Sequence, residues 1–170
     1  MKNYTLQLRN GDILFQKNKL NIKDVNTYLS PIIYFGINFW NRILGKPLSP
    51  VHHCGVLFQE YSTWYVYEAK SEGIVKTKLE DKLTNNDITT LIVKRYTNLT
   101  AQDGYVMKLY ADSVVNKVKY DGWSIVLQFF KQLFNSKIDL ATNPNKFKNK
   151  KMNCCEFVGE DCKRVGITFN

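Results

Sequence analysis

The sequence predicts an α+β protein in which an antiparallel sheet packs against helices. Short runs of β-branched and aromatic residues, separated by turns, occupy most of residues 51–96. Segments with apolar residues at helical spacing lie before and after these runs. The chain has 170 residues, of which 44 % are hydrophobic. This size suits one hydrophobic core, so we expect a single domain spanning residues 1–170.

The first strand is expected near the N-terminus, where the turn residues Gly11 and Asp12 precede a short apolar run ending near Gln16. Residues 17–27 are polar, and we expect a loop there. Four further strands are indicated by apolar and β-branched residues, at 51–59, 64–69, 73–79 and 89–96. A short turn separates the first two of these, so they should form an antiparallel hairpin.

Apolar residues at helical spacing predict four helices, at 28–44, at about 99–118, at 124–134 and, after an N-cap at 153, at 154–165. The first has Pro31 near its start, where proline is tolerated, and Gly36 weakens its middle. The second should place on one face the residues Val106, Leu109, Tyr110, Ser113 and Val114. A turn is expected at 120–122 and a loop at 143–151.

The last expected helix begins at a cysteine. Asn153 is a good N-cap, Glu156 follows it three residues later as in a capping box, and Gly166 is a natural stop. The helix dipole and the free N–H groups of a first turn favour a thiolate, so we expect a lowered pKa for Cys154. Such a thiol can act as a nucleophile. The alternative is a buried core cysteine, because free cysteines are among the most buried residues.

A cysteine nucleophile needs a base, and a third group that orients the base. The chain has two histidines, His52 and His53, and adjacent strand residues point to opposite faces, so at most one should face a given site. Gly55 shares a face with His53 and would leave room there for a substrate or for the cysteine helix. Glu68, in the next strand, could pair with an imidazole N–H. The residues thus suggest a Cys154–His53–Glu68 triad; the alternatives are an edge position for His52 and a solvent-facing salt bridge for Glu68.

Four short motifs occur in order along the chain, at 11–15, 53–56, 67–69 and 154–158. In this order they resemble the circularly permuted branch of the NlpC-type papain-like hydrolases, a YiiX-like group to which lecithin–retinol acyltransferases are more distantly similar. In that branch the histidine strand precedes the cysteine helix, as it does here. The resemblance covers nearly the whole chain, and it implies a papain-like fold of the permuted NlpC type.

The resemblance implies a cysteine hydrolase, either an amidase or peptidase or an acyl esterase, that works through an acyl-enzyme. It assigns Cys154 as the nucleophile, His53 as the base and Glu68 as the orienting group. The backbone N–H of Cys154 is expected to hold the oxyanion, and Tyr120 and Asn153 are further oxyanion or substrate candidates.

Two features depart from that family. Cys155 stands where relatives usually have serine, and it is either a bystander or a partner in a regulatory disulfide. The basic run 146–151 directly precedes the cysteine helix. This run is either a solvated loop or a source of positive potential that favours the thiolate.

The members of the family act on cell-wall peptides, lipid-linked amides and acyl groups. The expected partner is therefore a peptide or an acyl amide or ester, lipid-linked substrates included. Phe35, Phe39 and Trp40, in the first expected helix, suit the lipid-linked version because they could line an apolar access route or bind a membrane surface. The alternative for this helix is plain core packing.

The net charge of +9 supports a different function, a non-catalytic basic binding module for an anionic membrane or nucleic acid. We find no aromatic–basic motif of a known nucleic-acid reader, so no specific nucleic-acid partner is expected. Zinc is a third hypothesis, because the four cysteines and two histidines are potential ligands. The chain has no Cys-x-x-Cys pair, and adjacent cysteines at a helix start are awkward tetrahedral ligands, so we expect no metal and no other cofactor.

The first ten residues are polar, so no signal peptide is expected, and no stretch reaches the roughly 18 apolar residues of a membrane span. The four cysteines, two of them adjacent, do not form the pattern of a secreted disulfide framework. These observations favour a cytoplasmic location.

Overall fold

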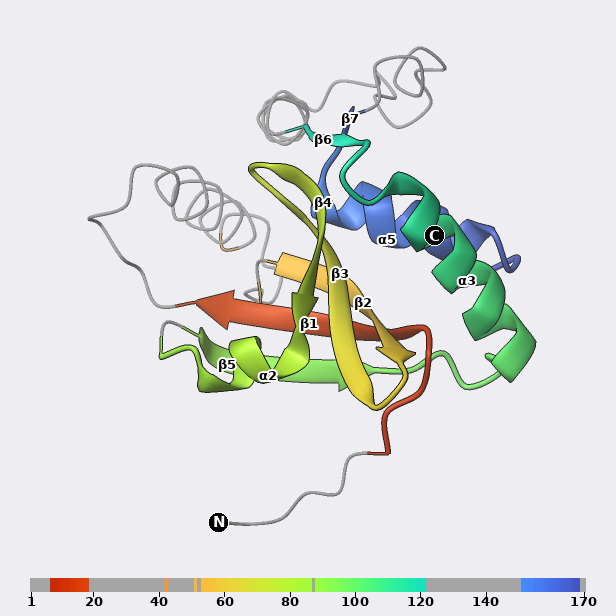
Figure 1. The fold of residues 1–170 in the computed structure, drawn as a ribbon, viewed down its shortest axis with the longest axis horizontal. Coiled ribbons are helices and arrows are strands. Elements are labelled where there is room, and N and C mark those ends of the chain that lie inside the picture. Colours follow the sequence, from red (N-terminus) through yellow and green to blue (C-terminus); the bar gives the residue numbers. More distant parts are fainter. Residues whose placement is uncertain are drawn as a thin grey trace.

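A computed structural model of the chain describes residues 7–18, 42, 51, 53–86, 88–121 and 151–168. Five antiparallel strands form the main sheet, in the order β4-β3-β2-β1-β5 (Figure 1). The strands are β1 (Asp12–Asn18), β2 (His53–Glu60), β3 (Thr63–Lys70), β4 (Gly73–Lys78) and β5 (Ile88–Lys94). All five expected strands are confirmed, as is the hairpin formed by β2 and β3.

β1 is longer than its apolar run predicts. Lys17 and Asn18, which we expected in a loop, continue the strand and pair with Thr90 and Ile88 of β5. β1 lies between β2 and β5, so partners are available along both of its edges. Backbone hydrogen bonds therefore extend the strand into polar residues, and the prediction of a loop from residue 17 was wrong for these two.

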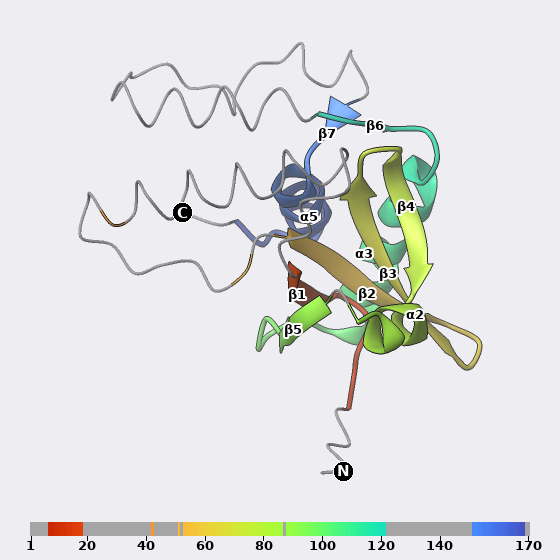
Figure 2. The ribbon, with the colours of Figure 1, turned by 90° about the vertical axis from the view of Figure 1, so that its left-hand side faces the viewer.

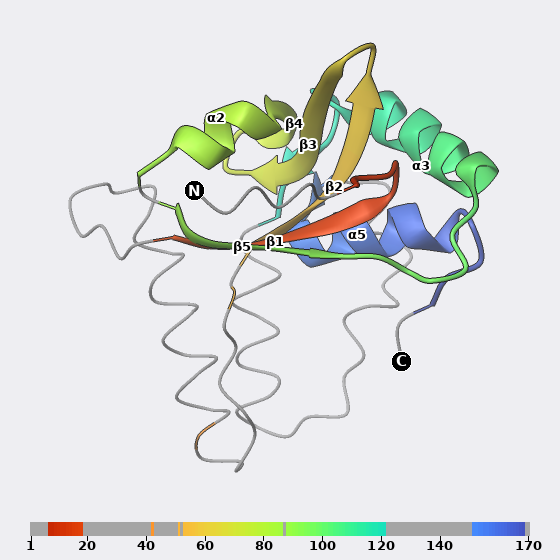
Figure 3. The ribbon, with the colours of Figure 1, turned by 90° about the horizontal axis from the view of Figure 1, so that it is seen from below.

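Helices cover both faces of the sheet (Figure 3). They are α2 (Leu79–Thr84), α3 (Ala101–Val114) and α5 (Cys154–Lys163). On one face, Met107 of α3 and Phe157 of α5 pack against alternate residues of β2 and β3. On the other face, Leu79 at the start of α2 packs against a smaller cluster that contains Leu57. The sheet is therefore the middle layer, and each face of β2 serves a different core cluster.

α3 begins after Thr100, as expected, but it ends at Val114 instead of continuing to about residue 118. Asn116 takes a left-handed conformation, with φ 59°, and its N–H donates to the carbonyl oxygen of Ile74. The N–H of Ile74 donates in turn to the carbonyl oxygen of Val118. The chain thus leaves the helix because its backbone groups bond to the start of β4.

The buried face of α3 agrees with the prediction only in part: Tyr110 and Val114 pack against the core cluster, as expected. The helix buries Gly104, Met107 and Ala111, whereas Leu109, which we placed on the inward face, is 51 % exposed. Gly104 lies against the chain before β1, where a Cβ would be 2.8 Å from the carbonyl oxygen of Asn10. This close approach turns the small residues inward, and a count of large apolar residues could not reveal it.

A two-stranded sheet replaces the turn that we expected at residue 120. β6 (Lys119–Tyr120) pairs in parallel with β7 (Lys151–Met152), and the N–H of Asp121 donates to the carbonyl oxygen of Met152. The expected turn and the end of the expected loop were therefore wrong at these positions. β7 leads directly into α5, so this pairing anchors the chain just before the cysteine helix.

Two expected helices, at 28–44 and 124–134, lie outside the described residues, apart from Arg42. His52 and most of the expected loop at 143–151 also lie outside them. The access candidates Phe35, Phe39 and Trp40 belong to the first of these segments. Among the residues that the structure describes, no helix has both the length and the apolar content needed to cross a membrane.

Candidate active site

The N-terminus of α5 has the geometry that its sequence predicts. The side-chain oxygen of Asn153 accepts a hydrogen bond from the N–H of Glu156 at 2.9 Å, and the Glu156 carboxylate accepts one from the N–H of Asn153 at 3.1 Å. This capping box confirms the predicted helix start. Gly166 adopts a left-handed conformation, with φ 76°, shortly after the helix ends. Cys154 is thus the first helical residue, where free N–H groups and the helix dipole favour negative charge.

His53 and Glu68 form the pair suggested by the sequence. Glu68 lies on β3 opposite Gly55 of β2, and its Oε2 is 2.6 Å from Nε2 of His53. The Glu68 side chain is fully buried, whereas that of His53 is 19 % exposed. The carboxylate therefore holds the ring in place, and the ring stays accessible at the end of the sheet.

α5 does not lie on the face where we expected Gly55 to leave room for a substrate or for the cysteine helix. It packs with Cys54 and its neighbours, not on the face that His53 shares with Gly55. A Cβ at Gly55 would be 2.7 Å from the carbonyl oxygen of Tyr67, so this glycine allows β3 to approach and leaves no room for the helix. His53 is the first residue of β2, which begins beside α5 (Figure 2). From this position at the sheet end it interacts with Cys154, despite belonging to the other face, and each of the two groups shifts the pKa of the other.

The contacts between these residues favour a thiolate next to an imidazolium. Hydrogen bonds from Cys155 and Cys54 lower the pKa of Cys154 well below its ordinary value; burial opposes this effect, and His53 adds to it. Burial alone would lower the pKa of His53, but its hydrogen bonds with Cys154 and Glu68 raise it to about 9. An ion pair of this kind is the reactive form of a cysteine nucleophile.

Glu68 has three further partners that sequence analysis did not identify. Thr77 donates to Oε1 at 2.9 Å, Lys82 donates to Oε2 at 2.8 Å, and the ammonium of Lys70 lies 3.2 Å from Oε1. Burial alone would raise the pKa of Glu68, but the hydrogen bond from His53 and the charges of His53 and Lys82 lower it. The carboxylate is therefore ionised although it is fully buried.

Lys82 is the most buried of these partners. It lies on α2, is 5 % exposed, and also donates to Oε1 of Gln16 at 2.6 Å. Burial lowers the pKa of Lys82, and the charge of Glu68 opposes this. The sequence offered one indirect signal, that a buried glutamate needs a cation, but it could not say which lysine supplies it.

Tyr120 and Asn153 both lie close to Cys154. Tyr120 packs against the core cluster that contains Cys154, and burial together with the neighbouring thiol charges raises its pKa to about 12. Its hydroxyl therefore keeps its proton and can donate a hydrogen bond. The side-chain oxygen of Asn153 caps α5, so this residue positions Cys154. Their contacts with an oxyanion or a substrate remain predictions.

Three of the four cysteines meet at the start of α5. The Sγ atoms of Cys54, Cys154 and Cys155 all lie within 4.8 Å of one another, and those of Cys54 and Cys155 are 4.0 Å apart. Within the described part of the chain, this is the one group of cysteine, histidine and acidic side chains whose donor atoms are close enough for a metal ion. The sequence contains no Cys-x-x-Cys pair that would have indicated this group, because its cysteines come from two segments that are far apart along the chain. Cys162, also on α5, does not belong to this group.

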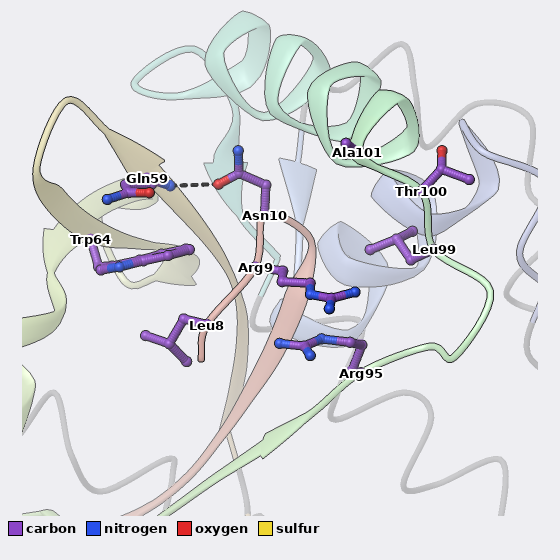
Figure 4. A pocket seen from close by; sticks show the side chains of 9 residues that line it. All are labelled: Leu8, Arg9, Asn10, Gln59, Trp64, Arg95, Leu99, Thr100 and Ala101. Carbon is purple, nitrogen blue, oxygen red and sulfur yellow. Dashed lines mark hydrogen bonds between the residues drawn. The ribbon is translucent and has the colours of Figure 1, made fainter. Parts of the chain in front are cut away.

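A separate cavity of about 330 Å³ lies at the other end of β2, where Gln59, Trp64, Arg95 and Leu99 line it (Figure 4). Gln59 and His53 are roughly 20 Å apart along the strand. The guanidinium of Arg95 pairs with the buried Asp12, Nε to Oδ1, at 2.7 Å. This cavity therefore does not belong to the site at Cys154.

The fold resembles that of a solved bacterial protein. The crystal structure of the metalloprotein YiiX from Escherichia coli O157:H7, DUF1105, matches with a TM-score of 0.57 and 16 % sequence identity. The match covers 95 % of this chain and 68 % of the YiiX chain. No family model and no curated protein matches the sequence. The chain therefore has a YiiX-like α+β fold, and the resemblance first indicated by its motifs is confirmed at this level.

Proposed function

We propose that this protein is a cysteine hydrolase, an amidase or peptidase or an acyl esterase, that works through an acyl-enzyme. The observation that carries this proposal is the continuous chain of contacts from Cys154 through His53 to Glu68. The three groups favour the protonation states that the reaction needs: thiolate, imidazolium and carboxylate. The YiiX-like fold supports the proposal, since the resemblance in the motifs implies the same three roles.

In the first half-reaction, the Cys154 thiolate attacks the carbonyl carbon of an amide or ester, and the carbonyl π electrons move to oxygen. The backbone N–H of Cys154, at the start of α5, can donate to that oxyanion. As the tetrahedral intermediate collapses, the C–N or C–O bond breaks. The His53 imidazolium gives its proton to the leaving group, which leaves a thioester on Cys154 and a neutral imidazole.

In the second half-reaction, a water molecule attacks the thioester while His53 takes its proton. Collapse of this intermediate releases the carboxylic acid and restores the Cys154 thiolate and the His53 imidazolium. Glu68 keeps its charge throughout, because its role is to orient the ring and stabilise the imidazolium. Lys82 and Thr77 hold Glu68 in place from the other side of the carboxylate.

The substrate class follows from the same site. We propose a peptide or an acyl amide or ester, with lipid-linked substrates included. The basic charge of the chain, +9, suits a substrate presented at an anionic membrane surface. A comparison of water-soluble and vesicle-embedded acyl esters would show which form is hydrolysed.

The test is the reaction of the purified full chain with iodoacetamide across pH, with the modified residue identified by peptide mass spectrometry. We expect Cys154 to react at a pH well below the ordinary thiol pKa, as a hydrolase nucleophile should. Cys154→Ala should abolish the fast reaction. Cys162→Ala is the matched control, because it removes a buried thiol from the same helix and should change nothing.

The same measurement separates the hydrolase from the non-catalytic basic module. If all four cysteines react slowly, and only near the ordinary thiol pKa, the hydrolase proposal fails. Binding to anionic vesicles or nucleic acid that weakens steeply with salt would then support the module.

A further inference from the structure

The reaction proposed above uses Cys154 as its nucleophile, whereas Cys54 and Cys155 serve it only through hydrogen bonds that favour the thiolate. Cys54 is buried and is the second residue of β2, while Cys155 is exposed and is the second residue of α5. Both sulfur atoms lie within 4.8 Å of the sulfur of Cys154. Hydrolysis by a cysteine, a histidine and a glutamate needs neither of them.

We propose that Cys54, Cys154 and Cys155 together bind a thiophilic metal ion of the zinc type. Zinc binds thiolate sulfur at about 2.3 Å, so sulfur atoms around one ion lie roughly 3.8–4.0 Å apart. The separation of 4.0 Å between Cys54 and Cys155 already matches this spacing. The remaining pairs, within 4.8 Å, need only small rotations of the side chains.

The position of the cluster also favours a metal thiolate. Cys154 and Cys155 occupy the first turn of α5, where the helix dipole and the free N–H groups stabilise negative charge on sulfur. Cys54 comes from a strand in the middle of the sheet, so the ligands are supplied by two rigid elements. The basic composition of the chain, +9, is compatible with a site that carries three thiolates.

The chemistry of the ligand set selects the class of ion. Three sulfur donors exclude magnesium and calcium, which require oxygen ligands, and favour zinc or copper(I). Binding is a substitution that involves no change of oxidation state: each thiol that still holds a proton releases it as its sulfur donates a lone pair to the ion. Three protein ligands leave a fourth position that a water molecule can fill.

If the proposed function holds, this site also regulates it. The lone pair with which Cys154 would attack a carbonyl is donated to the metal, so the loaded protein should be inactive. The metal then acts as a reversible inhibitor, removed by a chelator. Metal binding itself does not depend on the hydrolase proposal, and each can be tested without the other.

The test is a titration of the metal-free full chain with Zn²⁺ under a non-chelating reductant, in competition with a chromogenic chelator. A parallel titration with Co²⁺ reports sulfur ligation directly through its charge-transfer absorption. We expect one bound ion per chain. Cys54→Ser and Cys155→Ser should each weaken binding by at least about 100-fold, because loss of a direct ligand exceeds the 10–100-fold cost of losing an outer-shell partner.

Cys162→Ser is the control, since this thiol lies on α5 outside the cluster. Cys155→Ser guards against misfolding as the cause of a loss, because Cys155 is exposed and contributes little to the core. The proposal is overturned if the wild-type chain binds no Zn²⁺, or if Cys162→Ser lowers affinity as much as Cys155→Ser does.

The two proposals fail separately. A metal-free chain in which Cys154 is rapidly alkylated, but which binds no Zn²⁺, contradicts the metal site and leaves the hydrolase standing. A chain that binds one Zn²⁺ through the three thiols, but whose metal-free form shows no fast alkylation of Cys154, supports the metal site and contradicts the hydrolase.

Discussion

Two carboxylates in this protein are equally buried and yet have opposite surroundings. Glu68 on β3 and Asp161 on α5 are both 0 % exposed. Glu68 contacts four side chains, three of which can be cationic, and its pKa is lowered. Neither carboxylate oxygen of Asp161 has a hydrogen-bond partner among the described residues, and burial raises its pKa to about 8.

The difference shows that the surrounding partners, not burial, decide the charge of a buried acid. Burial alone would keep either group protonated. The carboxylate of Glu68 hydrogen-bonds with His53 and Lys82, and these bonds offset the free energy lost when its charge leaves water. The ionised carboxylate can therefore orient the ring beside Cys154. At Asp161 the charge of Arg164 only partly offsets burial, so the neutral acid is favoured. The first environment suits catalysis, and the second gives stability a dependence on pH.

The largest effect should follow from removing the charge of Glu68. In Glu68→Gln the imidazolium of His53 loses its counter-charge, so the pKa of His53 should fall and the thiolate of Cys154 should become less populated. We expect the alkylation rate of Cys154 by iodoacetamide at about pH 6 to drop roughly 10–100-fold. This drop corresponds to a rise of about one to two in the pKa of Cys154.

Asp161→Asn is the matched control for this experiment. It makes the same change from acid to amide at an equally buried site in the helix that carries Cys154. Its alkylation rate should stay within about twofold of wild type, because the carboxylate of Asp161 has no hydrogen bond to any described residue. Equal losses in the two variants would mean that the effect is a general one of helix packing, and that Glu68 has no particular role.

The next effect is on stability. Lys82→Met removes the most buried cation near Glu68. The carboxylate of Glu68 then has fewer partners and resembles more closely that of Asp161. We expect the free energy of unfolding, measured with urea, to fall by roughly 3 kcal/mol, since breaking a buried ion pair leaves a charge without compensation.

The control uses a pair of similar length at the surface. Lys163 contacts Glu160 at 2.6 Å, but its side chain is 59 % exposed. Lys163→Met should cost less than about 1 kcal/mol, because water replaces the lost partner. A Lys82 variant as stable as this control would show that His53 and Lys70 suffice to hold the charge of Glu68.

A third effect concerns pH and has opposite signs for the two acids. The folded pKa of Asp161, about 8, exceeds its unfolded value, so the folded state holds an extra proton between about pH 4 and pH 8. Stability should therefore fall as pH rises through this window, by up to about 4 kcal/mol between pH 5 and pH 8. The folded pKa of Glu68 lies below its unfolded value, so its contribution is present above the unfolded pKa and is lost at acid pH.

Urea unfolding of wild type and Asp161→Asn at about pH 5 and pH 8 isolates the contribution of Asp161 to the pH dependence of stability. His53 titrates near the upper end of the range in both proteins, so its contribution cancels in the difference. We expect the pH dependence between the two values to be much smaller in the variant. Identical dependence in both proteins would indicate that the carboxyl of Asp161 is ionised in the folded state and has a partner.

Local features of the site could be predicted from the sequence, whereas contacts between distant segments could not. The start of α5 at Cys154 was predictable, because a capping box is local and its residues lie side by side in the sequence. The pairing of His53 with Glu68 was also within reach, since strand alternation and a hairpin bring them together. The YiiX-like fold could be predicted because four motifs kept their order along the chain.

What could not be predicted depends on which segments meet in space. Alternation gives β2 two faces but does not say which one a helix covers, so the sequence could not show that α5 packs on the face of Cys54 and not on that of Gly55. Lys82 and Asp161 are ionisable residues in helices, and their burial follows from packing that their neighbours in sequence do not encode. The cluster formed by Cys54 with Cys155 is hidden for the same reason, since about a hundred residues separate its ligands.

The smallest expected effects come from substitutions at glycines near each carboxylate, Gly55 for Glu68 and Gly159 for Asp161. A Cβ at Gly55 would lie 2.7 Å from the carbonyl oxygen of Tyr67 and 3.1 Å from Cβ of Glu68. Gly55→Ala should therefore push β2 and β3 apart, lower stability by roughly 1–3 kcal/mol, and lengthen the contact between His53 and Glu68. Slower alkylation of Cys154 would accompany the loss of stability.

Gly159 provides the counterpart in α5, two residues before Asp161. A Cβ there meets nothing within 4 Å, and the residue is in the interior of the helix. Gly159→Ala should raise stability by about 0.5–1 kcal/mol, because alanine loses less backbone entropy in a helix. The alkylation rate should not change. If Gly55→Ala lowered neither stability nor the alkylation rate, the contact between His53 and Glu68 would tolerate movement of the sheet. The length of that contact would then not determine the reactivity of Cys154.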